Sequence, residues 1–136
     1  MTSKQPTILY VEDEPRSRRV MQLITTEMDV SALTMFEDSS DFLTRVHQLD
    51  PQPDLVFLDI HVRPHSGFEM LGMLRQIDAY AKTPVVAMTA SVMNEEIQEL
   101  RTAGFSGCLA KPIDMDTFPD AVVRILNGES IWHIVS

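Results

Sequence analysis

Three acidic side chains, one hydroxyl and one ammonium group stand where short apolar runs of the sequence end. They are Glu12, Asp13, Asp59, Thr89 and Lys111. Carboxylates brought close together repel one another unless a cation joins them, and an all-oxygen ligand set favours a hard cation such as Mg²⁺. A lysine and a threonine suit phosphate oxygens. These residue types predict metal-assisted transfer of a phosphoryl group to a carboxylate, with Asp59 as the acceptor.

Each of these residues also has an ordinary interpretation. Acidic residues after a strand often open a helix and favour its dipole, and an aspartate at a strand end is commonly a turn former. Taken alone, Thr89 suits a β-strand and Lys111 suits a solvated surface. The prediction of a site therefore depends on all the pieces falling on one edge of a sheet.

Five strands separated by helical patterns would place them there. The apolar runs predict strands over Thr7–Val11, Ser31–Phe36, Asp54–Asp59, Val85–Thr89 and Ser106–Ala110. Apolar residues at helical spacing follow each run. This alternation predicts an α/β fold, a (βα)5 doubly wound parallel five-stranded sheet with helices on both faces. In such folds ligands bind at the carboxyl ends of the strands.

Local signals predict where three of the helix ends lie. Asp38 or Ser39 is the expected N-cap of the second helix. Asp116 is the expected N-cap of the last helix, because Pro119 is tolerated only in a first turn. Gly128 is the expected C-cap of that helix.

The composition limits the functions to consider. The chain has 136 residues, which suits one domain over residues 1–136, with a core over about 7–127 and a tail over 128–136. A formal net charge of −9 argues against direct nucleic-acid binding and binding to anionic membranes. The single cysteine excludes an intrachain disulfide and suits the cytoplasm, where we expect the protein. The sequence has no apolar run long enough to insert into a membrane.

Over about residues 7–126 the chain resembles the response regulator receiver domain of two-component signalling. The resemblance is carried by Val11–Pro15, Leu55–Ile60, Ala87–Ala90 and Ala110–Ile113. It implies a flavodoxin-like fold with strand order 2-1-3-4-5 and a cis peptide before Pro112.

The same resemblance implies roles for the site residues. Asp59 would be the phosphoacceptor, and Mg²⁺ would be held by Glu12, Asp13, Asp59 and the backbone carbonyl of His61. Thr89 would be the switch hydroxyl and Lys111 the phosphate-sensing lysine. Phosphate would come from a sensor histidine kinase or a phosphotransfer protein, and the downstream target would be another protein. Family members often form homodimers through the fourth helix, fifth strand and fifth helix.

The chain departs from the family pattern at two places. The family usually has an aromatic residue three positions before the lysine, where this chain has Cys108; we interpret Cys108 as a small buried residue rather than a redox-active thiol. The family's proline after the phosphoacceptor is shifted by one position to Pro64. This predicts a reshaped loop, in which Arg63 and His65 either contact the phosphate or a partner or are solvated.

These features favour a stand-alone phosphorylation switch rather than an enzyme that turns over a small molecule. Two alternatives remain, a receiver-fold interaction module that works without phosphorylation and a receiver excised from a longer regulator. A flavin-binding flavodoxin is disfavoured because Glu12–Glu14 would repel its phosphate. A dehalogenase-type phosphatase would need an aspartate where the chain has His61. The apolar tail beginning at Ile131 would extend the packing of the last helix or pair with another chain.

Overall fold

The chain forms one parallel five-stranded sheet between two layers of helices. The computed structural model describes residues 5–90 and 93–132. The strands are β1 (Thr7–Val11), β2 (Ala32–Phe36), β3 (Leu55–Asp59), β4 (Val85–Thr89) and β5 (Gly107–Ala110). Their order in the sheet is β2-β1-β3-β4-β5 with every pairing parallel, which confirms the predicted α/β fold and the strand order 2-1-3-4-5.

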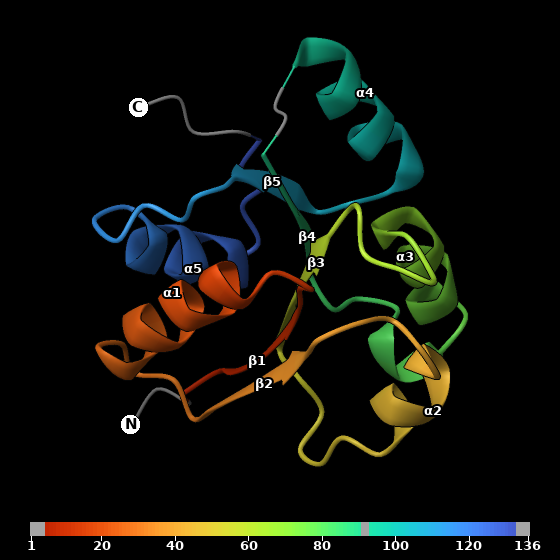
Figure 1. The fold of residues 1–136 in the computed structure, drawn as a ribbon, viewed down its shortest axis with the longest axis horizontal. Helices are drawn as coiled ribbons and strands as arrows, with labels where there is room; N and C mark the ends of the chain where they lie inside the picture. The colour runs from red at the N-terminus through yellow and green to blue at the C-terminus, as the bar shows by residue number, and fades with distance from the viewer. Residues whose placement is uncertain (1–4, 91–92, 133–136) are drawn as a thin grey trace.

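Helices cover both faces of the sheet (Figure 1). They are α1 (Pro15–Thr26), α2 (Phe42–His47), α3 (Gly67–Arg75), α4 (Asn94–Ala103) and α5 (Phe118–Leu126), with a short 3-10 turn η1 at Asp78–Tyr80. In Figure 1, α1 and α5 lie on one side of the sheet and α2, α3 and α4 on the other. None of these helices is both long and apolar enough to cross a bilayer, within the part of the chain that the structure describes.

Each face of the sheet has its own core because strand side chains alternate between the faces. Leu9 and Val11 of β1 belong to the α2–α3–α4 core, which includes Phe42, Leu74 and Leu100. The neighbouring β1 residues belong to the α1–α5 core on the opposite face, with Ile24 of α1 and Ile125 of α5 among its members. Burial of β1, β3 and β4 on both faces explains their continuous apolar sequences.

The predicted starts of α2 and α5 are both wrong, and α2 departs further from the prediction. The N-cap of α2 is Asp41, in a left-handed conformation with φ 50, rather than Asp38 or Ser39. Asp38 instead accepts a hydrogen bond from the Ser40 N–H at 3.0 Å, and Ser39 is drawn inward toward the loop after β3. The side-chain oxygens of both residues therefore accept hydrogen bonds outside α2 and do not cap it.

The ends of α5 differ less from the prediction. Thr117, not Asp116, precedes its first residue, and the Asp116 N–H donates to the carboxylate of Asp114 at 2.8 Å in the turn before the helix. The C-cap of α5 is Asn127 rather than Gly128, and Gly128 follows it with a φ of 94 and donates its N–H to the Ile125 carbonyl. The peptide bond before Pro112 is cis, as the resemblance implied.

The segment after α5 returns to the sheet. The Cys108 N–H of β5 donates to the Ile131 carbonyl at 2.7 Å, and Cys108 forms a parallel bridge with Trp132. Ile131 packs into the α1–α5 core, and Ile131 and Trp132 pair with the edge of β5 in their own sheet, which the sequence did not predict. The rest of the tail, residues 133–136, lies outside the described residues.

Candidate functional site

The register of the sheet brings the predicted site residues to one edge. Val11 pairs with Leu58, so the residues that follow them, Glu12 and Asp59, lie side by side at the carboxyl ends of β1 and β3. On the other side of β3, Thr89 at the end of β4 pairs with Ala110 of β5, directly before Lys111. Parallel pairing therefore collects side chains from four segments of the sequence, as the strand-end argument predicted.

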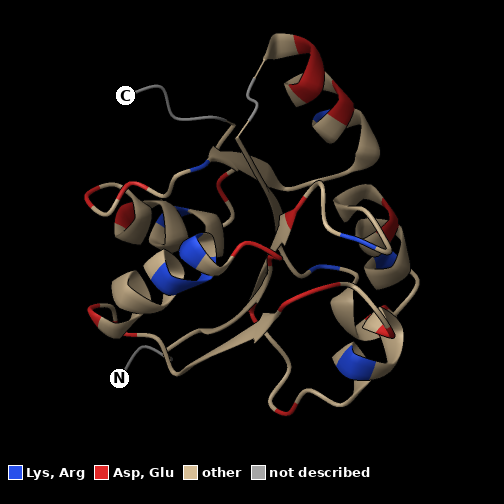
Figure 2. Cartoon of the chain, viewed as in Figure 1, with Lys and Arg blue, Asp and Glu red and all other residues tan. Residues whose placement is uncertain are grey.

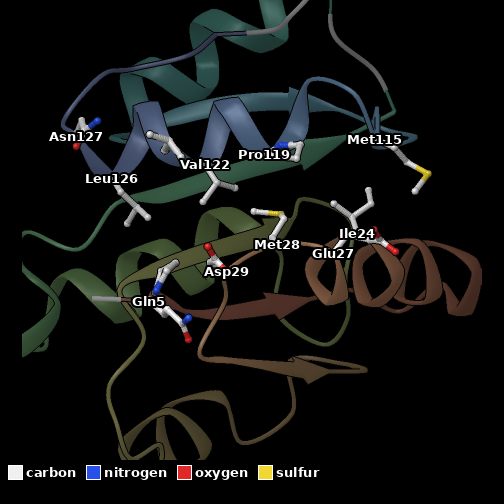
Figure 3. Close-up of a pocket in the computed structure, with 12 residues that line it drawn as sticks. Gln5, Ile24, Glu27, Met28, Asp29, Met115, Pro119, Val122, Leu126 and Asn127 are labelled. Atoms are coloured by element: carbon white, nitrogen blue, oxygen red, sulfur yellow. The ribbon is translucent and has the colours of Figure 1, made fainter. Parts of the chain in front are cut away.

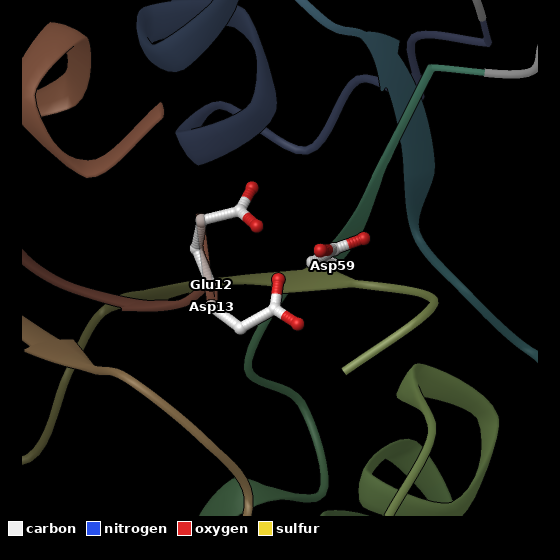
Figure 4. A group of neighbouring side chains, drawn as sticks. All are labelled: Glu12, Asp13 and Asp59. Atoms are coloured by element: carbon white, nitrogen blue, oxygen red, sulfur yellow. The ribbon is translucent and has the colours of Figure 1, made fainter. Parts of the chain in front are cut away.

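Three carboxylates form the centre of the site. Oxygen atoms of Glu12, Asp13 and Asp59 all lie within 4.8 Å of one another, and Figure 4 shows the three groups gathered beside the ends of β1 and β3. Glu12 is fully buried and Asp59 is 4% exposed, whereas Asp13 is exposed. The cluster thus has a buried floor of two carboxylates and one carboxylate at its mouth.

Lys111 is the cation of the cluster. Its Nζ lies 2.8 Å from Glu12 Oε1 and 3.4 Å from Asp59 Oδ2, and its side chain is 15% exposed. Its backbone N–H donates to the Thr89 carbonyl at 2.9 Å, and Thr89 is itself buried. Lys111 therefore joins the buried carboxylates to the ends of β4 and β5.

Tyr10 belongs to the site although its sequence position gave no direct sign of this. Its hydroxyl donates to Glu12 Oε1 at 2.8 Å. Burial, followed by the neighbouring charge of Glu12, raises the pKa of Tyr10, so the phenol keeps its proton. The alternation of side chains along β1 places Tyr10 and Glu12 on the same face, and this period of two is the signal that could have identified it.

The two buried carboxylates differ in acidity. Burial, and then the adjacent Glu12 carboxyl, raise the pKa of Asp59 to about 6. Burial also disfavours the charge of Glu12, but hydrogen bonding with Asp59, Lys111 and Tyr10 outweighs burial, and the pKa of Glu12 is lowered. Asp59 is therefore the carboxyl group that the protein itself stabilises least as an anion.

The charges of the cluster do not cancel, since three carboxylates face one ammonium group. Every donor among the carboxylates is oxygen, and one side of the cluster opens to solvent at Asp13. Hard divalent cations such as Mg²⁺ prefer this chemistry. The residues present therefore fit a cation of that class.

The loop after β3 is anchored by the segment between β2 and α2. The Ser39 hydroxyl is 2.6 Å from the His65 backbone nitrogen and 2.7 Å from the His65 carbonyl, and the Ser39 N–H donates to the Arg63 carbonyl at 3.1 Å. The side chain of Ser39, which sequence reasoning did not assign to the site, is fully buried. It fixes the path of the loop that leaves Asp59.

The loop residues named from the sequence take different places. The His61 N–H donates to Asp59 Oδ1 at 3.2 Å, so its backbone contacts the predicted acceptor. The His65 imidazole lies beside α3, with Nδ1 3.7 Å from Glu69 Oε2, and Arg63 is exposed. The prediction that Arg63 or His65 contacts the phosphate or a partner protein therefore stays a prediction.

Cys108 is buried within the α2–α3–α4 core. Burial, followed by the charge of Glu96, raises the pKa of its thiol to about 11. Because the thiolate is the reactive form, this environment favours an inert thiol. The structure agrees with the interpretation of Cys108 as a small buried residue.

A second surface feature lies away from these carboxylates. A groove of about 590 Å³ runs between α1 and α5 (Figure 3). Its walls include Ile24, Met28 and Val122, and none of its twelve lining residues belongs to the carboxylate cluster. Acidic residues elsewhere in the chain are spread over helices and loops (Figure 2). The convergence of carboxylates at the strand ends is thus a local feature of an acidic protein.

Comparison with known proteins agrees with the resemblance. The model of the response regulator receiver domain family matches residues 8–123. The chain is 34% identical over 120 residues to the sensor histidine kinase AruS of Pseudomonas aeruginosa, covering 87% of this chain and 12% of that protein. It is 30% identical to a nitrate/nitrite response regulator homologue of Haemophilus influenzae, covering 91% of this chain and 58% of that protein. The chain thus spans only part of these curated relatives.

Solved structures show the same fold. The chemotaxis response regulator CheY4 of Vibrio cholerae superimposes with a TM-score of 0.80 at 21% identity, over 90% of this chain and 99% of that one. The receiver domain of the histidine kinase PA1611 of P. aeruginosa, solved with a magnesium ion in its active-site cleft, has a TM-score of 0.79 at 19% identity, over 92% of this chain and all of that one. At these identities the likeness concerns the fold alone.

Proposed function

The chain belongs to the response regulator receiver domain family of two-component signalling, and from this membership we propose that it is a phosphorylation switch that accepts a phosphoryl group on Asp59. The observation that supports this most strongly is the environment of Asp59. Its carboxyl group is buried, lies against Lys111 on one side and Glu12 on the other, and has a pKa raised to about 6. Such a group is unstable as an isolated anion and is relieved by a cation or by a covalent bond.

In the proposed reaction an oxygen of Asp59 attacks the phosphorus of a phosphohistidine or a small acyl phosphate. The new bond joins Asp59 to phosphorus, and the bond between phosphorus and the donor breaks, leaving the electron pair on the donor. Lys111 Nζ, 3.4 Å from Asp59 Oδ2, would pair with the phosphoryl oxygens, and the Thr89 hydroxyl would donate to them. The His61 N–H holds Asp59 Oδ1, which orients the carboxylate.

The predicted metal has a role in this reaction. Bound by Glu12, Asp13, Asp59 and the backbone carbonyl of His61, Mg²⁺ would supply the positive charge that offsets repulsion between the carboxylates and the incoming phosphoryl oxygens. The chain's own contribution is to keep Glu12 ionised through its hydrogen bonds with Tyr10 and Lys111. The negative charge of Glu12 would then face the metal from the buried end of the site.

The proposal includes partners and location. The phosphodonor would be a sensor histidine kinase or a phosphotransfer protein, and the output would be a changed affinity for a protein target, in the cytoplasm. A stand-alone receiver and a receiver joined to a longer regulator would use the same site. Homodimerisation through α4, β5 and α5 would be one form of output.

The test is phosphorylation by acetyl phosphate in the presence of Mg²⁺, measured by the intact mass of the full chain. We expect the wild type to gain one phosphoryl group and Asp59→Asn to gain none. Asp29→Asn is the matched control, because it removes an exposed carboxylate from another part of the surface and should gain phosphate normally. Failure of the wild type to gain phosphate, or gain that survives Asp59→Asn, would refute the proposal.

Position 108 holds a cysteine where the family usually has an aromatic residue. This favours one alternative, an interaction module whose output does not depend on phosphorylation. Under this hypothesis the affinity for a target found by pull-down is the same before and after phosphodonor treatment. A phosphate-dependent change of affinity, absent in Asp59→Asn, would refute it.

A further inference from the structure

After α5 the chain pairs with the outer edge of β5 through an isolated parallel bridge at Trp132. The Cys108 N–H donates to the Ile131 carbonyl at 2.7 Å, and Cys108 and Trp132 are bridge partners in a parallel arrangement. Ile131, 6% exposed, packs into the α1–α5 core, whereas Trp132 packs against the α2–α3–α4 core. The two side chains thus point to opposite faces of the sheet, as consecutive residues of a strand do.

Gly107 permits the tail to approach this closely. A Cβ atom at position 107 would lie 2.6 Å from the Ile131 carbonyl oxygen and 3.3 Å from the Ile131 nitrogen. These are backbone atoms, so a side chain at position 107 and the docked tail exclude one another. The edge of β5 therefore accommodates the tail because position 107 is glycine.

Trp132 connects β5 with α4. Its indole packs against the α2–α3–α4 core, to which Cys108, Leu100 and Phe105 belong, and the Arg101 guanidinium carbon of α4 lies 4.7 Å from the ring centroid. A cation over an aromatic face at this distance is attracted to it. An aromatic side chain thus sits beside the strand that carries Cys108, supplied by the tail.

We propose that Ile131 and Trp132 form a latch that covers the β5 edge while Asp59 is unmodified and leaves it when Asp59 is phosphorylated. This inference rests on the proposed function. A phosphoryl group on Asp59 carries nearly two negative charges in place of the single charge of the carboxylate, and its oxygens attract the Lys111 ammonium and the Thr89 hydroxyl. Lys111 directly follows β5, and Thr89 ends the strand that precedes α4.

Attraction at these two points moves β5 and α4 relative to one another. Trp132 contacts both elements, through the bridge to Cys108 and through Arg101. A displacement of one element against the other therefore breaks one of the contacts that hold the indole. Release uncovers the Cys108 N–H and the apolar site of the indole. That surface has the chemistry to bind an extended segment of a partner protein that carries an aromatic side chain.

The latch has a built-in reporter, since Trp132 is the sole tryptophan of the sequence. The experiment measures acrylamide quenching and the emission maximum of the full chain with Mg²⁺, before and after acetyl phosphate, with phosphate uptake followed by intact mass. We expect phosphorylation to increase quenching and to shift the emission to longer wavelength. Asp59→Asn should show neither change.

Gly107→Ala opens the latch without phosphate if the inference is correct, because the new Cβ meets the Ile131 carbonyl. Its fluorescence should resemble that of the phosphorylated wild type. Gly72→Ala is the matched control, because a Cβ at position 72 meets nothing within 4 Å and should leave Trp132 docked. Arg101→Ala gives a second opening variant that leaves the core intact, since Arg101 is exposed.

The outcomes separate the two claims. Phosphate uptake with unchanged or reduced quenching overturns the latch and leaves the proposed function in place. Failure to take up phosphate overturns the proposed function and the latch with it. Wild-type quenching in both Gly107→Ala and Arg101→Ala shows that these contacts do not hold the tail, and also overturns the latch.

Discussion

Replacing Asp59 by asparagine should stabilise the protein in the absence of metal. Asp59 is buried beside Glu12, and its pKa is raised from 3.8 to about 6. A carboxyl group whose pKa is higher in the folded than in the unfolded state loses folding free energy when it ionises. Asparagine keeps an oxygen that accepts the His61 N–H and removes the charge.

The magnitude follows from the two pKa values. Below pH 3.8 the carboxyl group is protonated in both states and destabilises nothing. As the pH rises to about 6 the unfolded chain ionises first, and above 6 the full penalty is present. A difference of about two pH units, at about 1.4 kcal/mol for each, gives a gain of about 3 kcal/mol for Asp59→Asn at pH 7.5 as an upper limit. At pH 5 the gain should be about half as large.

Urea denaturation with a chelator present, at pH 7.5 and pH 5, measures this free energy of unfolding. The exposed Asp29→Asn serves as the control, because it removes the same charge from the surface. Adding Mg²⁺ should stabilise the wild type more than Asp59→Asn and so reduce the difference between them. A variant that is less stable than the wild type, or a gain that is the same at both pH values, would show that the two buried carboxylates do not repel one another as argued.

Three further predictions concern other parts of the structure. Lys111→Met should lower the metal-free free energy of unfolding by about 3 kcal/mol, because it leaves Glu12 and Asp59 buried without their ammonium partner; unchanged urea midpoints would contradict this. Cys108 should react with iodoacetamide far more slowly in native than in urea-unfolded protein at pH 8, because its thiol is buried with a pKa of about 11; equal rates would contradict it. Ser66→Ala should cost about 1 kcal/mol, since it removes the capping box of α3, and Ser66→Asp should restore most of the loss in thermal unfolding.

The strand ends could be predicted because they depend on a strong local signal and one geometric rule. The apolar runs of β1, β3 and β4 are buried on both faces, so their sequences show where they begin and end. Parallel pairing then requires that Glu12, Asp59 and Lys111 meet at one edge. The contact between Tyr10 and Glu12 needed the further step of assigning each β1 residue to a face.

The features that sequence reasoning missed depend on contacts between distant segments. Ser39 and His65 are 26 positions apart, and their hydrogen bonds withdraw Ser39 from its expected capping role. Cys108 and Ile131 are separated by the whole of α5, and no residue pattern in the tail indicates that it pairs with β5. Such contacts are decided by the shape of the assembled sheet.

The contrast between Glu12 and Asp59 suggests why one of two neighbouring buried carboxylates becomes the acceptor. Glu12 receives the Tyr10 hydroxyl and the Lys111 ammonium at 2.8 Å and the Glu14 N–H at 3.2 Å, so its negative charge is well compensated. Asp59 has the His61 N–H at 3.2 Å and Lys111 at the longer distance of 3.4 Å. Because Glu12 holds its charge, it disfavours the charge of Asp59, and a cation or a bond to phosphorus relieves Asp59 first. The hydrogen bonds of Glu12 therefore contribute to the reactivity of Asp59, although of their donors only Lys111 also contacts Asp59.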